Sequence, residues 1–455
     1  MQPTTAQPES LRRQLTLLGL WLLVVNGMIG AGIFGIPADA QRLAGAFSPW
    51  LFALGAILIA PIMLCFAQLS SAFTGTGGPV LYAQTAFGPF VGFQIGWAFY
   101  IARLTASAAN INLLVATIGF FWQEPMGPAV RVGLLLFTCA VLVWLNVAGA
   151  RTAMRSLGFL TVVKLLPLLV LAAIGLTALD RALFASFSST PKPADLGAAI
   201  LLVIYAYVGF ESGLVPAGES RRPQRDMPRA LVLALVGVGA VYFLIQAAAQ
   251  RIVPDLAASP RPIVEAGEAL LGRAGAVVVV VAIIASVGGN LLGSVFSAPR
   301  VTYCLALERQ LPPCFALVHP RRQTPWVSIV VYGGAIFGLA ATGSFARLAV
   351  LSVFTRLLIY IVCIAAMPRV SASAREDSGV FRLPGGHAIP ALALLVCLAL
   401  LTQVSRNSVL ATAVLLAVGT ALFWIASVRR RSTPPPPSAT LSEGPGGAIR
   451  GVEPR

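Results

Sequence analysis

Twelve long apolar segments occupy most of this 455-residue sequence and constrain its fold more than any other feature. A helix needs about 20 mostly apolar residues to cross the hydrocarbon of a bilayer. The segments are continuous, whereas the strands of a membrane β-barrel show alternating polarity over about ten residues. We therefore predict an all-α integral membrane protein with about 12 transmembrane helices. The predicted spans are 17–36, 48–73, 89–120, 128–148, 157–178, 196–217, 229–250, 274–304, 326–343, 346–367, 387–404 and 408–428.

The composition supports a membrane protein and argues against a soluble one. Hydrophobic residues make up 57% of the chain, and charged residues make up only 11%. Soluble domains carry about 25% charged residues, so this chain lacks the polar surface that soluble domains of its total length would need. The few charges are therefore informative wherever they occur.

Membrane topology explains the excess of positive charge. The chain has 32 Lys and Arg against 16 Asp and Glu, a net charge of +16, which taken alone would suit a nucleic-acid binder. If both termini lie in the cytoplasm, 20 of these bases fall on the cytoplasmic side and 9 on the opposite side. The positive-inside rule expects this asymmetry in short loops. We predict a multi-pass protein of the cell (inner) membrane, with both termini cytoplasmic and with no nucleic-acid partner.

The two ends of the chain are predicted to be short cytoplasmic segments. Residues 1–16 are polar, and the span that follows them is longer than the apolar core of a cleavable signal peptide. Residues 429–455 include four consecutive prolines at 434–437, a composition typical of a disordered tail.

Motifs for catalysis, cofactors and metals are missing from the sequence. Its six cysteines occur singly, without a CxxC pair, and its two histidines are far apart. There is also no GxxxxGK[ST] phosphate-binding loop, which argues against an ATP-driven pump. We therefore predict that the protein is not an enzyme and uses no cofactor or metal.

Two of the spans contain residues that interrupt a helix. Between Asn26 and Pro37, the first span holds four glycines, and with the proline they make a continuous helix unfavourable. The sixth span has a similar interruption between Tyr205 and Gly213, followed by Pro216 and Gly218. Glycines that allow tight helix packing are the alternative explanation. Because the first and sixth spans correspond in a five-plus-five inverted repeat, paired interruptions favour a binding site between them.

This pattern also sets the predicted domain organisation. We expect a first inverted repeat at 17–178, a second at 196–367, and two additional helices at 387–428. The start of a half-helix presents free N–H groups that suit a carboxylate, and the end of the preceding half presents carbonyl groups that suit an ammonium. An α-amino acid carries both groups on one carbon, so two broken helices favour an amino acid over a sugar or an inorganic ion.

Four ionisable residues lie deep inside predicted spans: Arg103, Lys164, Glu211 and Arg356. A charge at the centre of a membrane helix costs about 2.5–3.5 kcal/mol, so such residues usually face a cavity and find a partner. Lys164 is the candidate for proton coupling because a buried lysine loses its proton more readily than an arginine. The alternative is that its side chain reaches back to the cytoplasmic interface.

The other three charged residues have two interpretations each. Glu211 either contacts substrate or a proton, or forms a structural salt bridge with Arg103 or Arg356. The two arginines either form fixed ion pairs or lie near the side chain of the substrate, since an arginine hardly ever gives up its proton.

A series of short motifs resembles the amino acid–polyamine–organocation (APC) transporter superfamily over 17–428. Their order along a twelve-span chain makes the resemblance specific. The motifs are GMIGAGIF at 27–34, GGP at 77–79 with Tyr82-Ala83, GFE at 209–211 with AGE at 217–219, and RVTYCLALERQLP at 300–312 with Thr324-Pro325.

The resemblance implies the LeuT-type fold, which has two inverted five-helix repeats and two further helices. It also assigns roles to matching residues. Ala31 and Gly32 would offer backbone amides to the carboxylate of the substrate. The carbonyl groups of Met28, Tyr205 and Val208 would accept hydrogen bonds from its ammonium.

Further roles follow from the same resemblance. Tyr205 matches an aromatic gate, and Glu211 matches a glutamate of the sixth helix, in the related arginine/agmatine antiporter. Ser107 would contact the substrate side chain. Asn290 stands where that antiporter has an aromatic residue, so arginine or polyamine specificity does not carry over.

Lys164 matches a lysine that proton-coupled members hold where sodium-coupled relatives bind a cation. By this resemblance it would reach the Gly27 carbonyl and Ser286, and its fixed ammonium argues against sodium coupling.

The sequence therefore predicts a proton-coupled amino-acid permease that works by alternating access. Its expected partners are an amino acid, a proton and the lipid bilayer. The alternatives are an amino-acid or polyamine exchanger and, less favoured, a transporter-like amino-acid sensor. The sequence does not identify the amino acid carried or the oligomeric state.

Overall fold

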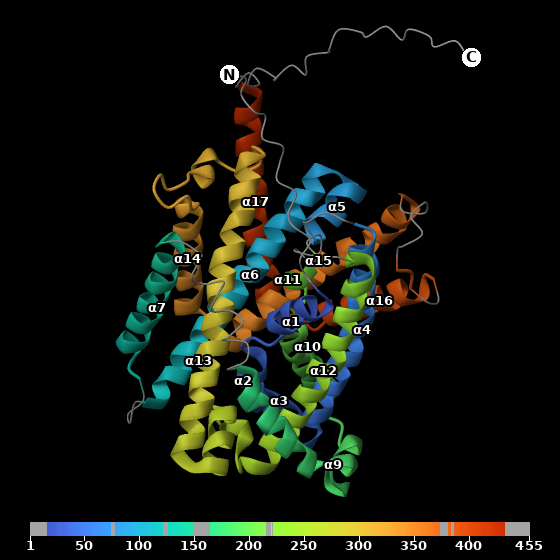
Figure 1. The fold of residues 1–455 in the computed structure, drawn as a ribbon, viewed down its shortest axis with the longest axis vertical. Helices are drawn as coiled ribbons and strands as arrows, with labels where there is room; N and C mark the ends of the chain where they lie inside the picture. The colour runs from blue at the N-terminus through green and yellow to red at the C-terminus, as the bar shows by residue number, and fades with distance from the viewer. Residues whose placement is uncertain are drawn as a thin grey trace, which may run out of the picture.

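The computed structural model describes residues 16–73, 78–121, 126–148, 164–214, 220, 222–373, 381–383 and 386–432. Helices dominate these ranges (Figure 1). Their bounds are α1 Leu17–Met28, α2 Gly32–Gly35, α3 Pro37–Ala44, α4 Ser48–Ser71, α5 Pro79–Phe87, α6 Pro89–Ile118, α7 Pro128–Ala148, α9 Arg181–Ala185, α10 Pro193–Tyr207, α11 Glu211–Leu214, α12 Pro223–Ile252, α13 Pro262–Leu307, α14 Trp326–Thr342, α15 Phe345–Ser373, α16 Ala388–Leu401 and α17 Arg406–Ser432.

The helices agree with the predicted all-α membrane fold. Within the described ranges, nine helices are long and apolar enough to cross a membrane. The helices Lys164–Ala178 and Arg181–Ser188 are bent by 83° relative to each other, and the number of spans in these ranges is ten if this pair is counted as one. The two shorter apolar helices, α14 and α16, fall on the remaining two predicted spans. The first part of the predicted span 157–178 lies outside the described residues, as do the segments 1–15 and 433–455.

Both predicted interruptions are present as breaks of three residues. Helix α1 ends at Met28 and α2 begins at Gly32, while α10 ends at Tyr207 and α11 begins at Glu211. Gly209 has a φ of +108°, a conformation that residues with a side chain rarely adopt. The glycines of the sequence thus mark where the backbone leaves the helix. The boundaries of the inverted repeats stay a prediction.

The broken helices lie at the centre of the molecule, surrounded by longer ones (Figure 1). Helix α6 packs against α13 and α15, and α12 packs against α4 and α1. In hydrocarbon a broken helix must satisfy its free backbone groups within the protein, so this enclosure is what allows the breaks to exist.

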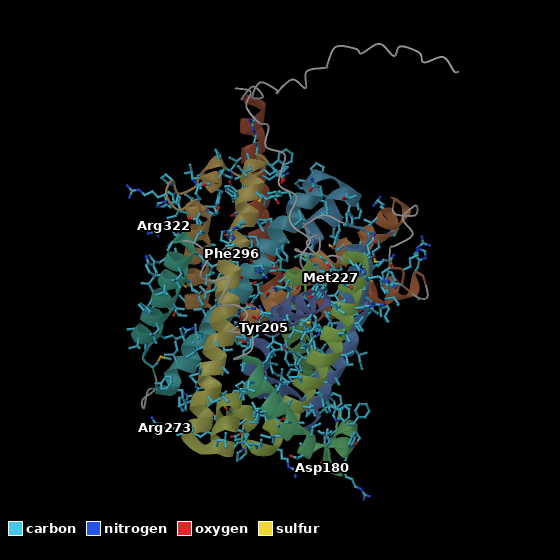
Figure 2. All side chains as sticks on the ribbon, in the orientation of Figure 1. Asp180, Tyr205, Met227, Arg273, Phe296 and Arg322 are labelled. Carbon is cyan, nitrogen blue, oxygen red and sulfur yellow. The ribbon has the colours of Figure 1, made fainter. Side chains whose placement is uncertain are left out.

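Charged residues that the sequence assigns to opposite sides of the membrane lie at opposite ends of the molecule. Figure 2 shows Arg322 near one end and Asp180 and Arg273 near the other, with Tyr205 between them. At the second end Asp180 caps α9, accepting a hydrogen bond from the backbone N–H of Leu183 at 2.9 Å, and pairs with Arg251 at 3.0 Å. The Leu183 N–H, and then the Arg251 guanidinium, hold the pKa of Asp180 below its ordinary value.

The outward faces of the bundle are apolar. Exposed large side chains include Phe137 and Trp144 of α7, Val236 of α12 and Leu395 of α16. Soluble monomers rarely expose apolar surface on several sides, whereas lipid requires it. The fold is therefore that of a multi-pass membrane protein.

Candidate functional site

A small cavity lies where the two helix breaks meet. Its volume is about 40 Å³, and it is lined by both breaks and by three neighbouring helices. Because a water molecule occupies roughly 10–15 Å³ on this measure, the cavity has room for a few waters or a small polar solute. The lining residues are Gly27, Met28, Gly30, Ala31, Gly32, Arg103, Ala106, Asn110, Tyr205, Val208, Gly209, Asn290, Ser294 and Arg356.

The break after α1 presents backbone amides to this cavity. Ala31 accepts bonds from the amides of Phe34 and Gly35 at 3.1 and 3.0 Å, so the new helix starts there. Within the described residues no backbone hydrogen bond is recorded from the amides of Ala31 or Gly32. Free amides at the start of a helical segment favour an anionic group. Both residues were predicted from the sequence to contact a carboxylate, and both line the cavity.

The carbonyl groups of the breaks are only partly free. The Met28 carbonyl accepts from the Gly30 amide at 2.9 Å and from the Tyr242 hydroxyl at 3.1 Å, which uses both of its lone pairs. This arrangement leaves Met28 poorly suited to the predicted ammonium contact. Tyr205 and Val208, the other two predicted acceptors, line the cavity at the break after α10.

Two side-chain amides and the Tyr205 ring line other sides of the cavity. The Tyr205 hydroxyl donates to Asn110 Oδ1 at 2.9 Å, and Asn110 Nδ2 donates to Asn290 Oδ1 at 3.0 Å. The Tyr205 ring meets the Phe345 ring edge-on, with centroids 5.8 Å apart. Sequence reasoning found Tyr205 and Asn290 but missed Asn110 and Phe345. The available signal for Asn110 was a pair of side-chain amides, Asn110 and Asn112, inside a predicted membrane span.

Lys164 is buried and bonds to the backbone beside the first break. Its ammonium donates to Asn26 Oδ1 at 2.5 Å, to the Ile29 carbonyl at 2.8 Å and to the Asn26 carbonyl at 3.4 Å. The side chain is only 1% exposed, so it does not reach toward the membrane interface. The structure therefore ties the end of α1 to the helix that carries Lys164.

These partners differ from the pair that the family resemblance implied. Three acceptors already match the three donors of the ammonium, and among the described residues neither the Gly27 carbonyl nor Ser286 is one of them. The Ser286 hydroxyl is buried and has no hydrogen-bond partner in the described part of the chain.

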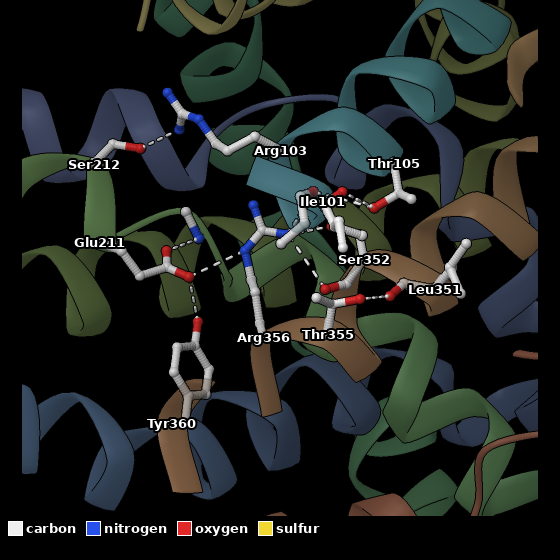
Figure 3. Close-up of polar contacts among 12 residues, drawn as sticks. Ile101, Arg103, Thr105, Glu211, Ser212, Leu351, Ser352, Thr355, Arg356 and Tyr360 are labelled. Atoms are coloured by element: carbon white, nitrogen blue, oxygen red, sulfur yellow. Dashed lines mark hydrogen bonds and ion pairs between the residues drawn. The ribbon is translucent and has the colours of Figure 1, made fainter. Parts of the chain in front are cut away.

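Glu211 is fixed in a buried polar network behind the cavity. Its Oε1 accepts from the Tyr360 hydroxyl at 2.6 Å and pairs with Arg356 Nε at 3.0 Å, while its Oε2 accepts from the Gly209 amide at 2.6 Å (Figure 3). Of the two interpretations left open by the sequence, the structure displays the salt bridge, and Arg356 is the partner. Glu211 is not among the residues that line the cavity.

Ser107 also lies behind the cavity wall. Its hydroxyl bonds to that of Ser294 at 2.9 Å and to that of Tyr332 at 3.1 Å. Ser294 lines the cavity and Ser107 does not. Ser107 would therefore act on a substrate through its hydrogen bond to Ser294.

Arg103 lines the cavity together with Arg356. Its guanidinium donates to the Ser212 hydroxyl at 2.6 Å and to the Ser297 hydroxyl at 2.7 Å. Neither contact brings a negative charge to this arginine. The cavity thus has amides on one side, a pair of asparagines on another, and cationic groups on a third.

Known proteins resemble this chain along nearly its whole length. Residues 15–440 match the sequence model of the family described as amino acid permease. A serine/threonine exchanger of Bacillus subtilis is 28% identical over 404 residues, covering 85% of this chain and 90% of that protein. An uncharacterized transporter of Mycobacterium tuberculosis is 30% identical over 438 residues, covering 93% of each. A proposed arginine/ornithine antiporter of Bacillus subtilis is 28% identical over 352 residues, covering 69% of this chain and 74% of that protein.

Proposed function

We propose, from the premise that this chain belongs to the amino acid permease family of the APC superfamily, that it moves an amino acid across the cell membrane by alternating access. The observation that supports this most directly is the cavity between the two helix breaks. Broken helices in secondary transporters place free backbone groups at the substrate, and rocking of one helix bundle against the other exposes the site to each side in turn.

The substrate would lie with its charged groups on the two breaks. Its carboxylate would accept hydrogen bonds from the amides of Ala31 and Gly32. Its ammonium would donate to the carbonyl groups of Tyr205 and Val208, because the Met28 carbonyl already has two donors. Tyr205 would also close the cavity against Phe345, since their rings are in contact.

Lys164 would couple transport to protons. Its ammonium holds Asn26 and Ile29 at the end of α1, so loss of a proton would weaken three hydrogen bonds to a helix that borders the cavity. A proton can drive transport only if it binds one conformation better than the other. Contacts between Lys164 and a broken helix that changes shape during transport would provide that difference.

Amino-acid exchange is a second candidate function. It is supported by the names of two relatives, a serine/threonine exchanger and a proposed arginine/ornithine antiporter. An exchanger needs amino acid on both sides, whereas a proton-coupled carrier needs only a proton gradient. Uptake into proteoliposomes with and without internal amino acid separates the two mechanisms.

The general proposal is tested with purified protein and a complete set of amino acids and polyamines. At least one amino acid should raise the thermal unfolding temperature, and the same compound should be taken up by proteoliposomes that contain the protein. Binding without uptake, with or without internal amino acid, would instead support the sensor alternative. If none of these compounds binds to the protein or is taken up, the proposal is overturned.

A further inference from the structure

The charged groups at the cavity do not balance. Arg103 and Arg356 are the charged residues among those that line it, and Arg356 is paired with Glu211. Within the described residues, Glu211 is the carboxylate in this group, so the three side chains carry a net charge of +1. A cation that lies inside a membrane-spanning segment without a counter-charge is unfavourable and usually marks a functional site.

Arg356 is neutralised by the Glu211 carboxylate, which lies 3.0 Å from its Nε. Besides the Glu211 carboxylate, it donates to the carbonyl groups of Ala102 and Ser352 at 3.3 and 3.5 Å, and to the Ser352 hydroxyl. Figure 3 shows Arg356 between Glu211 on one side and Ser352 on the other. The excess charge therefore belongs to Arg103.

Arg103 keeps unused donors. A guanidinium has five N–H groups, and in the described part of the chain Arg103 uses two of them, on the neutral hydroxyls of Ser212 and Ser297. Its Nε is buried and has no hydrogen-bond partner there. The Phe99 ring lies 5.6 Å from the guanidinium carbon, so it supports the group without neutralising it. Two hydroxyls thus position a guanidinium that still lacks an anion.

We infer that Arg103 binds the side-chain carboxylate of an acidic amino acid, so that the substrates of this protein are L-aspartate and L-glutamate. The inference rests on the proposed function, which places the α-carboxylate and the α-ammonium on the helix breaks. An acidic amino acid has a second carboxylate and a net charge of −1, which balances the +1 of the cavity. A guanidinium pairs with a carboxylate through two parallel charge-assisted hydrogen bonds. A neutral substrate would leave Arg103 unpaired, and a basic one would add a like charge.

Competition in proteoliposomes with the unmodified protein tests the inference first. Uptake of labelled L-glutamate is measured against unlabelled acids and their amides, because L-asparagine and L-glutamine have nearly the same shape without the charge. The acids should inhibit at concentrations at least about tenfold lower than the amides, as expected for a charge-assisted pair replaced by a neutral one. L-Arginine and L-lysine should inhibit least.

Variants then assign the preference to Arg103. The ratio of acid to amide affinity should fall to about one in Arg103→Gln and should be partly retained in Arg103→Lys, which keeps the charge but not the paired donors. Arg42→Gln is the matched control, because it removes an exposed arginine of α3 and leaves the cavity charge unchanged. The ratio in that control should equal that of the unmodified protein.

The outcomes separate this inference from the proposed function. If neutral amino acids are transported and the acids do not compete better than the amides, the inference fails while the transport proposal stands. If chloride in place of gluconate stimulates that neutral transport, the anion at Arg103 is inorganic, and the inference also fails. If no amino acid binds or moves, both proposals fail.

Discussion

At the scale of single residues, the charges inside the membrane spans divide into one ion pair and two cations that lack a counter-charge among the described residues. Glu211 neutralises Arg356 inside the protein, whereas Lys164 and Arg103 bond to groups without charge. In a chain with only 11% charged residues, each buried charge has a large effect on the energy of the membrane interior. The three groups should therefore respond differently to substitution.

Replacing Lys164 with Gln should remove the pH dependence of uptake without unfolding the protein. Glutamine can still donate to Asn26 and the Ile29 carbonyl, but it cannot gain or lose a proton. The measurement is the initial rate of uptake in proteoliposomes across a series of pH values. Lys192→Gln is the matched control because Lys192 is the only other lysine of the sequence and is exposed. A pH profile in Lys164→Gln that matches the control would contradict the role of Lys164.

Substitution of Glu211 should destabilise the protein more than substitution of its neighbour Tyr360. Glu211→Gln leaves Arg356 buried without a counter-charge, and breaking a buried ion pair in this way costs about 3–5 kcal/mol. Tyr360→Phe removes one hydrogen bond to the carboxylate, which costs about 1.5–3 kcal/mol. Thermal unfolding in detergent measures both, with the exposed Glu268→Gln as control. Equal unfolding temperatures for Glu211→Gln and Glu268→Gln would show that the ion pair between Glu211 and Arg356 does not contribute to the stability of the protein.

Sequence reasoning identified the buried charges but not their partners. A charge in an apolar span is visible in any linear reading, and so Arg103, Lys164, Glu211 and Arg356 could be found. Partners depend on which helix faces meet, and Tyr360 lies 149 residues from Glu211 along the chain. The same holds for Tyr242, whose bond to the Met28 carbonyl joins residues 214 positions apart.

At the scale of secondary structure elements, the two helix breaks act as one unit. The backbone of Gly27 and the backbone of Gly209 are so close that a Cβ atom on either glycine would overlap the carbonyl of the other. Gly209 also has a positive φ that suits glycine. The sequence predicts each break because glycine clusters are local signals. The contact between the breaks could not be predicted, because it depends on how α1 and α10 pack.

Alanine at either of these glycines should abolish transport. Gly27→Ala and Gly209→Ala would force the breaks apart and distort the cavity that both line. Uptake and binding of the substrate should fall together, whereas loss of a remote contact would lower uptake alone. Gly237→Ala in α12 is the control, because a Cβ atom there would meet no neighbouring atom within 4 Å. Binding by Gly27→Ala at the level of that control would contradict the proposed site.

At the scale of the whole molecule, charge and hydrophobicity define an axis across the membrane. Apolar side chains cover the outward faces of the bundle. Arg322 lies near one end of the molecule, and Asp180 and Arg273 lie near the other. Hydrophobic length along the chain was sufficient to predict twelve spans, because a bilayer imposes the same requirement on each helix separately. The direction in which the molecule faces depends on the count of bases on each side, so it stays a prediction.

Cysteine labelling should reveal that direction. The two exposed native cysteines, Cys304 and Cys314, are first replaced by serine, since the other four cysteines are buried. Arg273→Cys and Arg322→Cys then form a matched pair, because both positions are exposed and each substitution removes one arginine. With the cytoplasmic termini that the positive-inside rule predicts, a membrane-impermeant maleimide should label position 273 in intact spheroplasts and position 322 only after permeabilisation. The reverse pattern would place the termini outside.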